Sequence, residues 1–304
     1  MINTKDFLGL KDVPYEVIES ILKKAADMKQ AFLMSKKLNN LSGKSVVTLF
    51  YENSTRTKMS FELAAKNLSA NVSSLTVAQS SVAKGESLID TGKTLDALGT
   101  NLVVIRHQTA GAPHLLAANM SASVVSGGDG MNEHPTQALL DMFTIKEKFG
   151  GFKGLKVLIA GDIKHSRVAR SNIWGLTKAG ASVTVCAPRT LMPDGIERMG
   201  VKIAKSLKEG AAGANVLMAL RLQLERQKAG LFPSMNEYNH YYNINDKIIA
   251  LSDKNAIVMH PGPINRGLEI SSGAADSSAS VITRQVTNGV AVRMALLDML
   301  LNKG

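Results

Sequence analysis

The sequence predicts an α/β protein of two domains, each a parallel β-sheet flanked by helices. Three observations lead to this prediction. Short β-branched runs alternate with helical repeats along most of the chain, which is typical of βαβ units. The 304 residues are about twice the size of a typical domain. A glycine-rich segment, GGFKG at 150–154, separates the two series, and such segments mark boundaries.

The first series runs from the N-terminus to residue 150. Residues 14–34 repeat apolar side chains at helical spacing, beginning with Val17, Ile18 and Ile21. A strand is expected at 45–51, followed by a helix in which Phe61, Ala64 and Leu68 share one face. Further strands are expected at 71–77, 101–106 and 123–127, and further helices near 88–98 and 135–149. We therefore expect a first domain at 1–150, with a C-terminal helix at 287–304 packing back on it.

The second series covers residues 151–286, the expected second domain. Strands are predicted at 155–161, 182–187, 215–221 and 256–260, and a helix at 166–179. The polar segment 223–247 lacks periodicity, so we expect a long loop with one short helix. Residues 268–280 are weakly patterned, and the closing helix is expected from residue 287 to residue 301.

Composition is that of a globular protein, with 45% hydrophobic and 20% charged residues. The first residues, MINTKDFLGLKDVPYE, do not show the basic region followed by an apolar stretch that is typical of a signal peptide. No run of about 18 consecutive apolar residues occurs. We expect a cytoplasmic protein that does not contact membranes. The single cysteine, Cys186, cannot form an internal disulfide and follows a predicted strand, so we expect it to be buried in a reducing compartment.

The charge balance indicates anionic partners. The chain has 36 Lys and Arg residues and 25 Asp and Glu residues, so its net charge is 36 − 25 = +11. This charge suits nucleic acid, anionic membranes or small polyanions as partners. Basic residues do not form a run, aromatic residues are only 5%, and no helix-turn-helix or RNP pattern is present. Nucleic acid is therefore not expected as a partner.

The sharpest motif is Ser54-Thr55-Arg56-Thr57, which follows a predicted strand and opens a predicted helix. Free backbone N–H groups and the helix dipole make such a position an anion site. The hydroxyls and the arginine fork add donors suited to phosphate. Taken alone, the tetrapeptide could equally be a simple helix cap.

The surrounding segment, YENSTRTKMSFELAAKNLSANV, resembles the carbamoyl phosphate segment of the aspartate and ornithine carbamoyltransferase family. The usual form is F-x-x-x-S-T-R-T-R-x-S-F-E, from which Tyr51, Asn53 and Lys58 depart mildly. The resemblance implies that residues 54–57 bind carbamoyl phosphate, and that Arg56 and Thr57 take part in catalysis.

A second motif is His134-Pro135-Thr136-Gln137, between a glycine-rich turn and a helix. A lone histidine there is more often a cap or core residue, and Arg106, which ends a predicted strand, could simply be solvated. The family carries H-P-T-Q. The resemblance implies that His134 donates to the carbonyl oxygen of carbamoyl phosphate, and that Gln137 contacts its amine. It also implies that Arg106 joins Thr57 and His134 around the oxyanion.

The segment QSSVAKGESLIDT separates the branches of the family. In aspartate-specific members, a loop ending in K-G-E supplies a serine and a lysine to the adjacent subunit. The resemblance implies that Ser80 and Lys84 act in this way, and that the protein is a homotrimer with shared active sites. Otherwise, a loop lysine is a solvated charge.

The second half carries Arg167, Arg221 and Gln223, which the family uses for aspartate. With Lys84, two arginines suit a substrate with two carboxylates. Backbone carbonyls of HPGP at 260–263 are implied to receive the substrate amino group, and Gly262 and Pro263 are placed at the carbamoyl phosphate site. Family members more often have Ala or Leu at Gly262. The nearby Arg170 and Arg226 are assigned to ion pairs.

The resemblance implies transfer of the carbamoyl group from carbamoyl phosphate to L-aspartate, a step of pyrimidine biosynthesis, without a metal or organic cofactor. L-Ornithine is the alternative acceptor, but the ornithine branch typically reads H-C-L-P where this chain has HPGP. An NAD-dependent oxidoreductase is disfavoured, because LKVLIAGDIKHSRVARSN lacks G-x-G-x-x-G. A regulatory chain, a dihydroorotase partner and nucleotide inhibition are left open.

Overall fold

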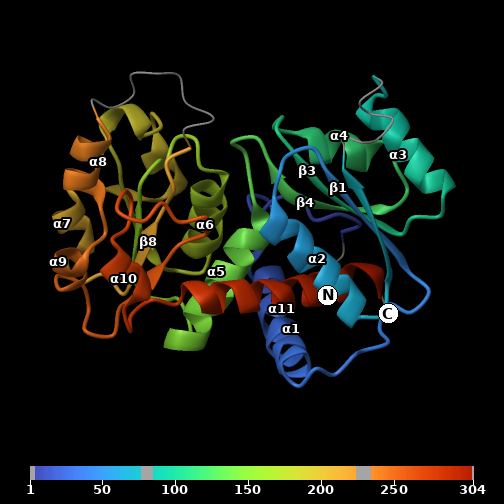
Figure 1. Cartoon of the computed structure of the whole chain (residues 1–304), viewed down its shortest axis with the longest axis horizontal. Coiled ribbons are helices and arrows are strands. Elements are labelled where there is room, and N and C mark those ends of the chain that lie inside the picture. The colour runs from blue at the N-terminus through green and yellow to red at the C-terminus, as the bar shows by residue number, and fades with distance from the viewer. Residues whose placement is uncertain (1–3, 77–84, 224–233, 303–304) are drawn as a thin grey trace. The chain divides into compact units, whose positions relative to one another are not determined.

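The computed structural model describes residues 4–76, 85–223 and 234–302. The chain forms two compact units: unit 1 comprises residues 1–143 and 287–304, and unit 2 comprises residues 144–286. Each unit has its own parallel sheet with helices on it (Figure 1). The predicted α/β class is thereby confirmed.

Unit 1 contains a four-stranded sheet in the order β2-β1-β3-β4. The strands are β1 (Ser45–Phe50), β2 (Asn71–Thr76), β3 (Leu102–His107) and β4 (Ser123–Asp129). All of their pairings are parallel, and Phe50 at the end of β1 is in register with Arg106. The carboxyl ends of the strands therefore lie along one edge of the sheet.

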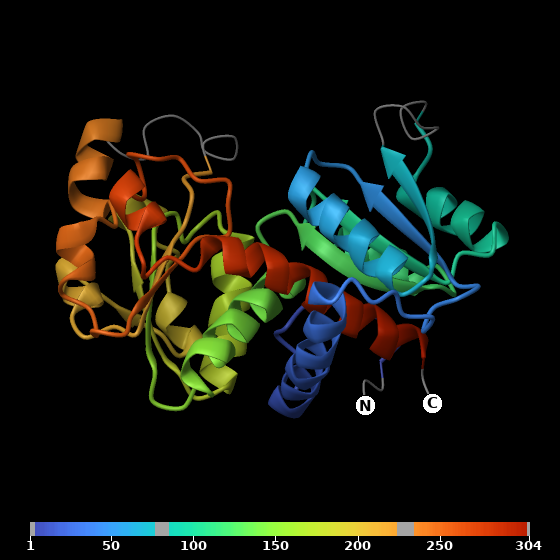
Figure 2. The same ribbon diagram turned by 60° about the horizontal axis from the view of Figure 1, so that its bottom comes forward.

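The helices of unit 1 are α1 (Tyr15–Leu33), α2 (Thr55–Asn67), α3 (Leu88–Ala97) and α4 (Ala112–Ala118). Helices α5 (Pro135–Phe149) and α11 (Ile282–Leu301) each continue into unit 2. Helices α3 and α4 pack against Val47 and Ile105 on one face of the sheet. Helix α2 covers the other face (Figure 2), where Thr48 hydrogen-bonds Ser74 and Ser74 hydrogen-bonds Glu62 of α2.

Unit 2 contains a five-stranded parallel sheet in the order β7-β6-β5-β8-β9. Its strands are β5 (Lys156–Ala160), β6 (Ser182–Cys186), β7 (Lys202–Ile203), β8 (Val216–Ala219) and β9 (Ile257–Met259). Its helices are α6 (Arg167–Lys178), α7 (Leu207–Ala211), α8 (Met235–Tyr242), α9 (Asp246–Ile249) and α10 (Ser272–Asp276). The short 3-10 turns η3 (Arg189–Leu191) and η4 (Ile196–Met199) lie between β6 and β7.

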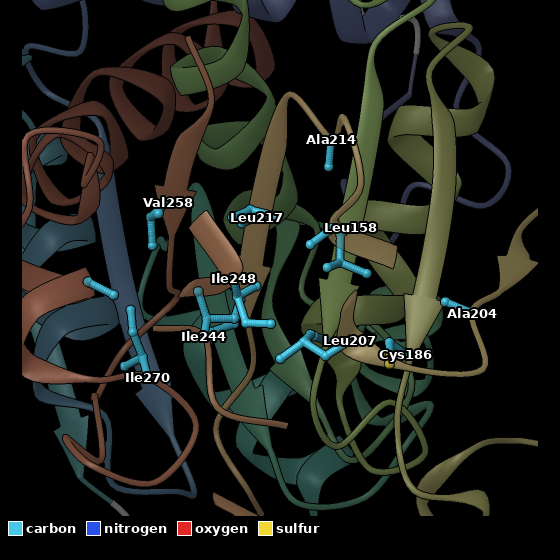
Figure 3. Close-up of a cluster of buried hydrophobic side chains, with 14 of the residues drawn as sticks. Leu158, Cys186, Ala204, Leu207, Ala214, Leu217, Ile244, Ile248, Val258 and Ile270 are labelled. Atoms are coloured by element: carbon cyan, nitrogen blue, oxygen red, sulfur yellow. The ribbon is translucent and has the colours of Figure 1, made fainter. Parts of the chain in front are cut away.

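The core of unit 2 joins the sheet to its short helices. Leu158 and Leu217, from neighbouring strands, pack with Leu207 of α7 and Ile248 of α9 (Figure 3). Cys186 lies in the same cluster. Its burial, and to a lesser degree Glu209, raises the pKa of the thiol to about 12. The prediction that Cys186 is a buried residue at a strand end is confirmed.

Several elements differ from the predictions. The closing helix begins at Ile282, five residues before the expected start, and Gln285 in its first turns accepts a hydrogen bond from the His260 backbone N–H at 3.0 Å. The described part of 223–247 holds helix α8 and the first two residues of α9, and α10 lies within 268–280. No helix in the described part of the chain is long and apolar enough to cross a membrane.

Candidate active site

The carboxyl ends of three strands meet at one edge of unit 1. The Tyr51 N–H, just after β1, donates to the Arg106 carbonyl at 2.9 Å, and the Gly130 N–H, just after β4, donates to the His107 carbonyl at 2.9 Å. Helices α2 and α5 both begin a few residues beyond these bonds. The edge therefore carries residues 54–57, Arg106 and residues 134–137, at the end of the sheet where α/β proteins bind ligands.

The N-terminus of α2 has the features that an anion site requires. Ser54 occupies the N-cap position, but within the described residues its hydroxyl makes no capping hydrogen bond. The first turn contains no acidic residue. Arg56 is exposed and Thr57 is buried. A simple helix cap is not supported, because the Ser54 hydroxyl does not accept a hydrogen bond from the first turn. The N–H groups at a helix N-terminus can instead donate to a bound anion.

Arg106 is paired with an acidic residue from the adjacent turn. Its Nε donates to Glu52 Oε2 at 3.1 Å and its Nη1 donates to the Gly127 carbonyl at 3.3 Å. The two charged side chains are only 14% and 18% exposed. Glu52 was not singled out in the sequence, although it lies two positions before the Ser54 motif. An anionic ligand that reaches this Nε must take the place of the carboxylate.

Two neutral rings lie beside this pair. The rings of Tyr51 and His107 are 4.5 Å apart between centroids. Burial lowers the pKa of His107 below its usual value, against opposing effects led by Glu52, and burial raises the pKa of Tyr51. The His107 Nδ1 accepts from the Thr109 N–H at 2.9 Å. Both rings therefore stay uncharged near pH 7, and sequence reasoning did not single out either.

The His134 segment is held by buried carboxylates. His134 and Gln137 are 4% and 8% exposed. Gln137 Nε2 donates to Asp141 Oδ1 at 3.0 Å, one turn further along α5. The Glu133 carboxylate accepts from the backbone N–H groups of residues 10 and 11, at 2.7 and 3.1 Å. Glu133 thus ties the start of α5 to residues 10 and 11, and Asp141 orients the Gln137 side chain from within the same helix.

In unit 2, the carboxyl ends of β5, β8 and β9 are neighbours in the sheet. Arg167 opens α6 and is 3% exposed, while Arg221 follows β8 and is partly buried. Gly161, after β5, has φ +131°, and a Cβ there would lie 2.5 Å from the Leu220 carbonyl oxygen. Only glycine fits at position 161, because the segments that follow β5 and β8 approach each other so closely there.

Asp162 forms hydrogen bonds within the segment that follows β5 and to the segment that follows β8. It is fully buried, and its carboxylate accepts from the His165 N–H at 3.1 Å and from the Gln223 N–H at 3.2 Å. The His165 ring Nδ1 lies 2.9 Å from Asp162 Oδ1. Sequence reasoning missed both residues, although an acidic residue directly after a buried strand was a usable signal.

The HPGP turn after β9 is fixed by a buried pair. His260 Nδ1 accepts from the Gly262 N–H at 2.7 Å, so the ring proton lies on Nε2, which donates to Glu269 Oε1 at 3.1 Å. Glu269 Oε1 also accepts from the Asn265 N–H at 2.7 Å. Pro263 is exposed. The turn is therefore rigid around Gly262, as its two prolines indicate.

Three residues of interest, Ser80, Lys84 and Arg226, lie outside the described residues. Across residues 4–76, 85–223 and 234–302, no group of three or more His, Cys, Asp or Glu side chains could hold a metal ion. The site residues predicted from the sequence contribute hydroxyl, amide, imidazole and guanidinium groups, and buried or half-buried carboxylates such as Glu52, Asp141 and Asp162 accept hydrogen bonds from several of them.

Two family models match nearly the whole chain. Residues 5–147 match the aspartate/ornithine carbamoyltransferase carbamoyl-P binding domain. Residues 153–300 match the aspartate/ornithine carbamoyltransferase Asp/Orn binding domain.

Relatives and solved structures agree with the family models. The chain is 59% identical to an aspartate carbamoyltransferase catalytic subunit of Acetivibrio thermocellus, over 99% of this chain and 96% of that protein. It is 58% identical to that of Caldanaerobacter subterraneus, over 97% of both chains. Aspartate transcarbamoylase from Trypanosoma cruzi in complex with carbamoyl phosphate and aspartate matches with TM-score 0.87 and 30% identity, over 96% and 95%. Ornithine carbamoyltransferase from Thermus thermophilus matches with TM-score 0.87 and 25% identity, over 98% and 99%.

Proposed function

This chain belongs to the aspartate/ornithine carbamoyltransferase family, and we propose that it transfers the carbamoyl group of carbamoyl phosphate to L-aspartate. The products are N-carbamoyl-L-aspartate and phosphate, which places the reaction in pyrimidine biosynthesis. The observation that carries the proposal is the identity of 53 to 59% to aspartate carbamoyltransferase catalytic subunits over nearly the full chain. The fold alone does not choose the acceptor, because the aspartate and ornithine enzymes match it equally well.

Carbamoyl phosphate is assigned to unit 1. Residues 54–57 would hold the phosphate with the N–H groups of the first turn of α2. Thr57, Arg106 and His134 would donate to the carbonyl oxygen, and Gln137 would contact the amine. The assignment is supported by the position of all four groups at one edge of a parallel sheet and by the uncapped N-terminus of α2 within the described residues.

L-Aspartate is assigned to unit 2. Arg167 and Arg221 would each hold a carboxylate, and Gln223, whose backbone is anchored to Asp162, would support them. Backbone carbonyls near Gly262 and Pro263 would receive the amino group. Both arginines follow strands that are neighbours in the sheet, which supports a common ligand.

The chemistry then needs no covalent enzyme intermediate. The deprotonated aspartate amine attacks the carbonyl carbon, and the tetrahedral intermediate expels phosphate. Thr57, Arg106 and His134 stabilise the negative charge that develops on the carbonyl oxygen. The departing phosphate is a suitable acceptor for the amine proton, and the two anionic substrates are held in place by fixed cations.

We also propose a cytoplasmic homotrimer whose active sites are shared between adjacent chains through Ser80 and Lys84. The homotrimer and the shared sites rest on the K-G-E segment of the sequence, and the cytoplasmic location rests on the single cysteine, which fits a reducing compartment.

An assay of the purified protein tests the proposed reaction. With carbamoyl phosphate and L-aspartate, we expect release of phosphate and formation of N-carbamoyl-L-aspartate; with L-ornithine in its place, we expect neither above background. Turnover of L-ornithine with no turnover of L-aspartate would assign the chain to the other branch of the family.

Replacing His134 by alanine should lower kcat by about 10² to 10³, or about 3 to 4 kcal/mol, because one donor to the oxyanion is lost. The matched control is His114→Ala, which removes an exposed histidine of α4 and should leave kcat unchanged. A loss below about fivefold for His134→Ala would make His134 a structural residue instead of an oxyanion donor.

Replacing Arg221 by alanine should raise KM for L-aspartate by about 10-fold to 100-fold, the cost of one charge-assisted hydrogen-bonded pair. KM for carbamoyl phosphate should stay close to that of the wild type, because that substrate is assigned to unit 1. Arg198→Ala, at an exposed position of unit 2, serves as the control. Equal increases for both substrates would contradict the division of binding between the two units.

A further inference from the structure

One buried arginine of unit 1 has protein acceptors on three helices. Arg293 of α11 is 3% exposed. Its Nη1 donates to Ser60 Oγ at 2.8 Å and to the Gly289 carbonyl at 3.1 Å. Its Nη2 lies 3.5 Å from Thr136 Oγ1, and its Cζ lies 4.8 Å from the centre of the Phe61 ring. A single guanidinium thus contacts α2, α5 and its own helix.

The two helices that it joins are those that begin at the candidate carbamoyl phosphate site. Ser60 lies one helical turn after Thr57, and both are buried on α2. Thr136 is the second residue of α5, between His134 and Gln137. The guanidinium therefore links the start of α2 to the start of α5 and helps to set the distance between them.

The surroundings are shaped for arginine. A Cβ on Gly289, one turn before Arg293, would lie 2.6 Å from Nη1, so glycine makes room for the guanidinium. Among the described residues, Nε is buried without a hydrogen-bond partner. Burial lowers the pKa of Arg293 to about 10, against the opposing charge of Asp141.

Stability alone gives little reason for this arrangement. A buried ionic group is often replaced by apolar side chains at no cost in stability, and an unsatisfied buried donor is unfavourable. What an arginine provides, and an apolar side chain does not, is a planar fork that holds two acceptors in fixed geometry.

We propose that Arg293 is a positioning residue for the carbamoyl phosphate site: by binding Ser60 and Thr136, it holds α2 and α5 so that Arg56, Thr57 and His134 converge on one ligand. This inference rests on the proposed function. Arg293 itself touches no substrate. Errors of about 1 Å in the placement of reacting groups can cost about 100-fold in rate, so a loosened pair of helices should be visible in the kinetics.

The test compares Arg293→Lys, which keeps the charge and loses the fork, with Ser60→Ala, which keeps the fork and loses its 2.8 Å acceptor. For Arg293→Lys, we expect kcat/KM for carbamoyl phosphate to fall by about 10-fold to 100-fold. KM for L-aspartate, measured at saturating carbamoyl phosphate, should change by less than about twofold, because unit 2 is untouched. Arg284→Lys, an exposed arginine of the same helix, should match the wild type.

The double variant Arg293→Lys/Ser60→Ala separates positioning from general damage. If Arg293 acts through Ser60, the double variant should be no worse than Arg293→Lys alone, since contacting residues are not additive. Thermal unfolding identifies any variant that fails to fold. If Arg293→Lys does not fold, the smaller change Ser60→Ala tests the proposal by itself. For Ser60→Ala, we expect kcat/KM for carbamoyl phosphate to fall by at least about threefold.

Two results would overturn the proposal: wild-type kinetics in folded Arg293→Lys or in Ser60→Ala, or equal losses for both substrates. Failure of the proposed function is a different result, since the wild-type protein itself would then not consume carbamoyl phosphate and L-aspartate.

Discussion

Replacing Arg56 by alanine is expected to reduce turnover by at least about 10³-fold, because Arg56 would stabilise the negative charge on the departing phosphate, and an arginine that stabilises charge on a reacting phosphoryl group contributes on this scale. Arg56 is the second residue of α2, where the helix N-terminus already favours an anion. Removing it takes away a bidentate donor that the backbone N–H groups cannot replace. The steady-state rate at saturating substrates measures the loss.

The fold should survive this change, because Arg56 is exposed. We expect a Tm within about 2 °C of the wild type. Lys66→Ala is the matched control, since it removes a positive charge from the last turn of the same helix, and its turnover should equal that of the wild type. Near-normal turnover of Arg56→Ala would show that the phosphate group does not bind at the N-terminus of α2.

The second large effect concerns chains acting together. Lys84→Ala should be nearly inactive on its own, like Arg56→Ala, because the proposed trimer completes each site with the Lys84 of an adjacent chain. When the two inactive proteins are dissociated, mixed in equal amounts and reassociated, activity should return. In a cyclic trimer, about one quarter of the sites then combine an intact Arg56 with an intact Lys84, since each is present with probability one half.

The mixing ratio gives the control for this experiment. Recovery should be greatest for equal amounts and should fall toward zero when either variant dominates. Reassociated wild-type protein shows that the procedure preserves activity. If wild-type trimers recover and the mixture does not, Lys84 acts within its own chain, and the shared site is wrong.

Local patterns predicted the elements that carry the site. The start of α2 after Ser54 and the start of α5 at Pro135 could be read from the alternation of strand and helix, because polar motifs directly after buried strands fall at the same edge of a parallel sheet. The family resemblance found from the motifs at residues 54–57 and 134–137 is confirmed by both family models.

The partners of these residues could not be predicted, because they depend on tertiary contacts. Nothing in the sequence relates Glu52 to Arg106, 54 positions apart, or Asp162 to Gln223. The early start of α11 has the same origin: Gln285 gains a buried hydrogen bond from the His260 backbone. Arg293 could not be singled out in a helix whose sequence is typical of a buried core element, since its side-chain acceptors Ser60 and Thr136 lie 233 and 157 positions away.

The discontinuous chain of unit 1 has a consequence for synthesis on the ribosome. Residues 1–143 are made first, but the unit is complete only with residues 287–304, which include buried positions of α11 such as Val292 and Leu296. At about 5 to 20 residues per second, this last helix follows the first part by roughly 8 to 30 s. The contiguous unit 2 emerges in full meanwhile, so the later-made half can finish folding before the earlier one. During that interval, the nascent chain exposes the apolar surface that α11 will cover, and this is the stage at which we expect it to need a chaperone most.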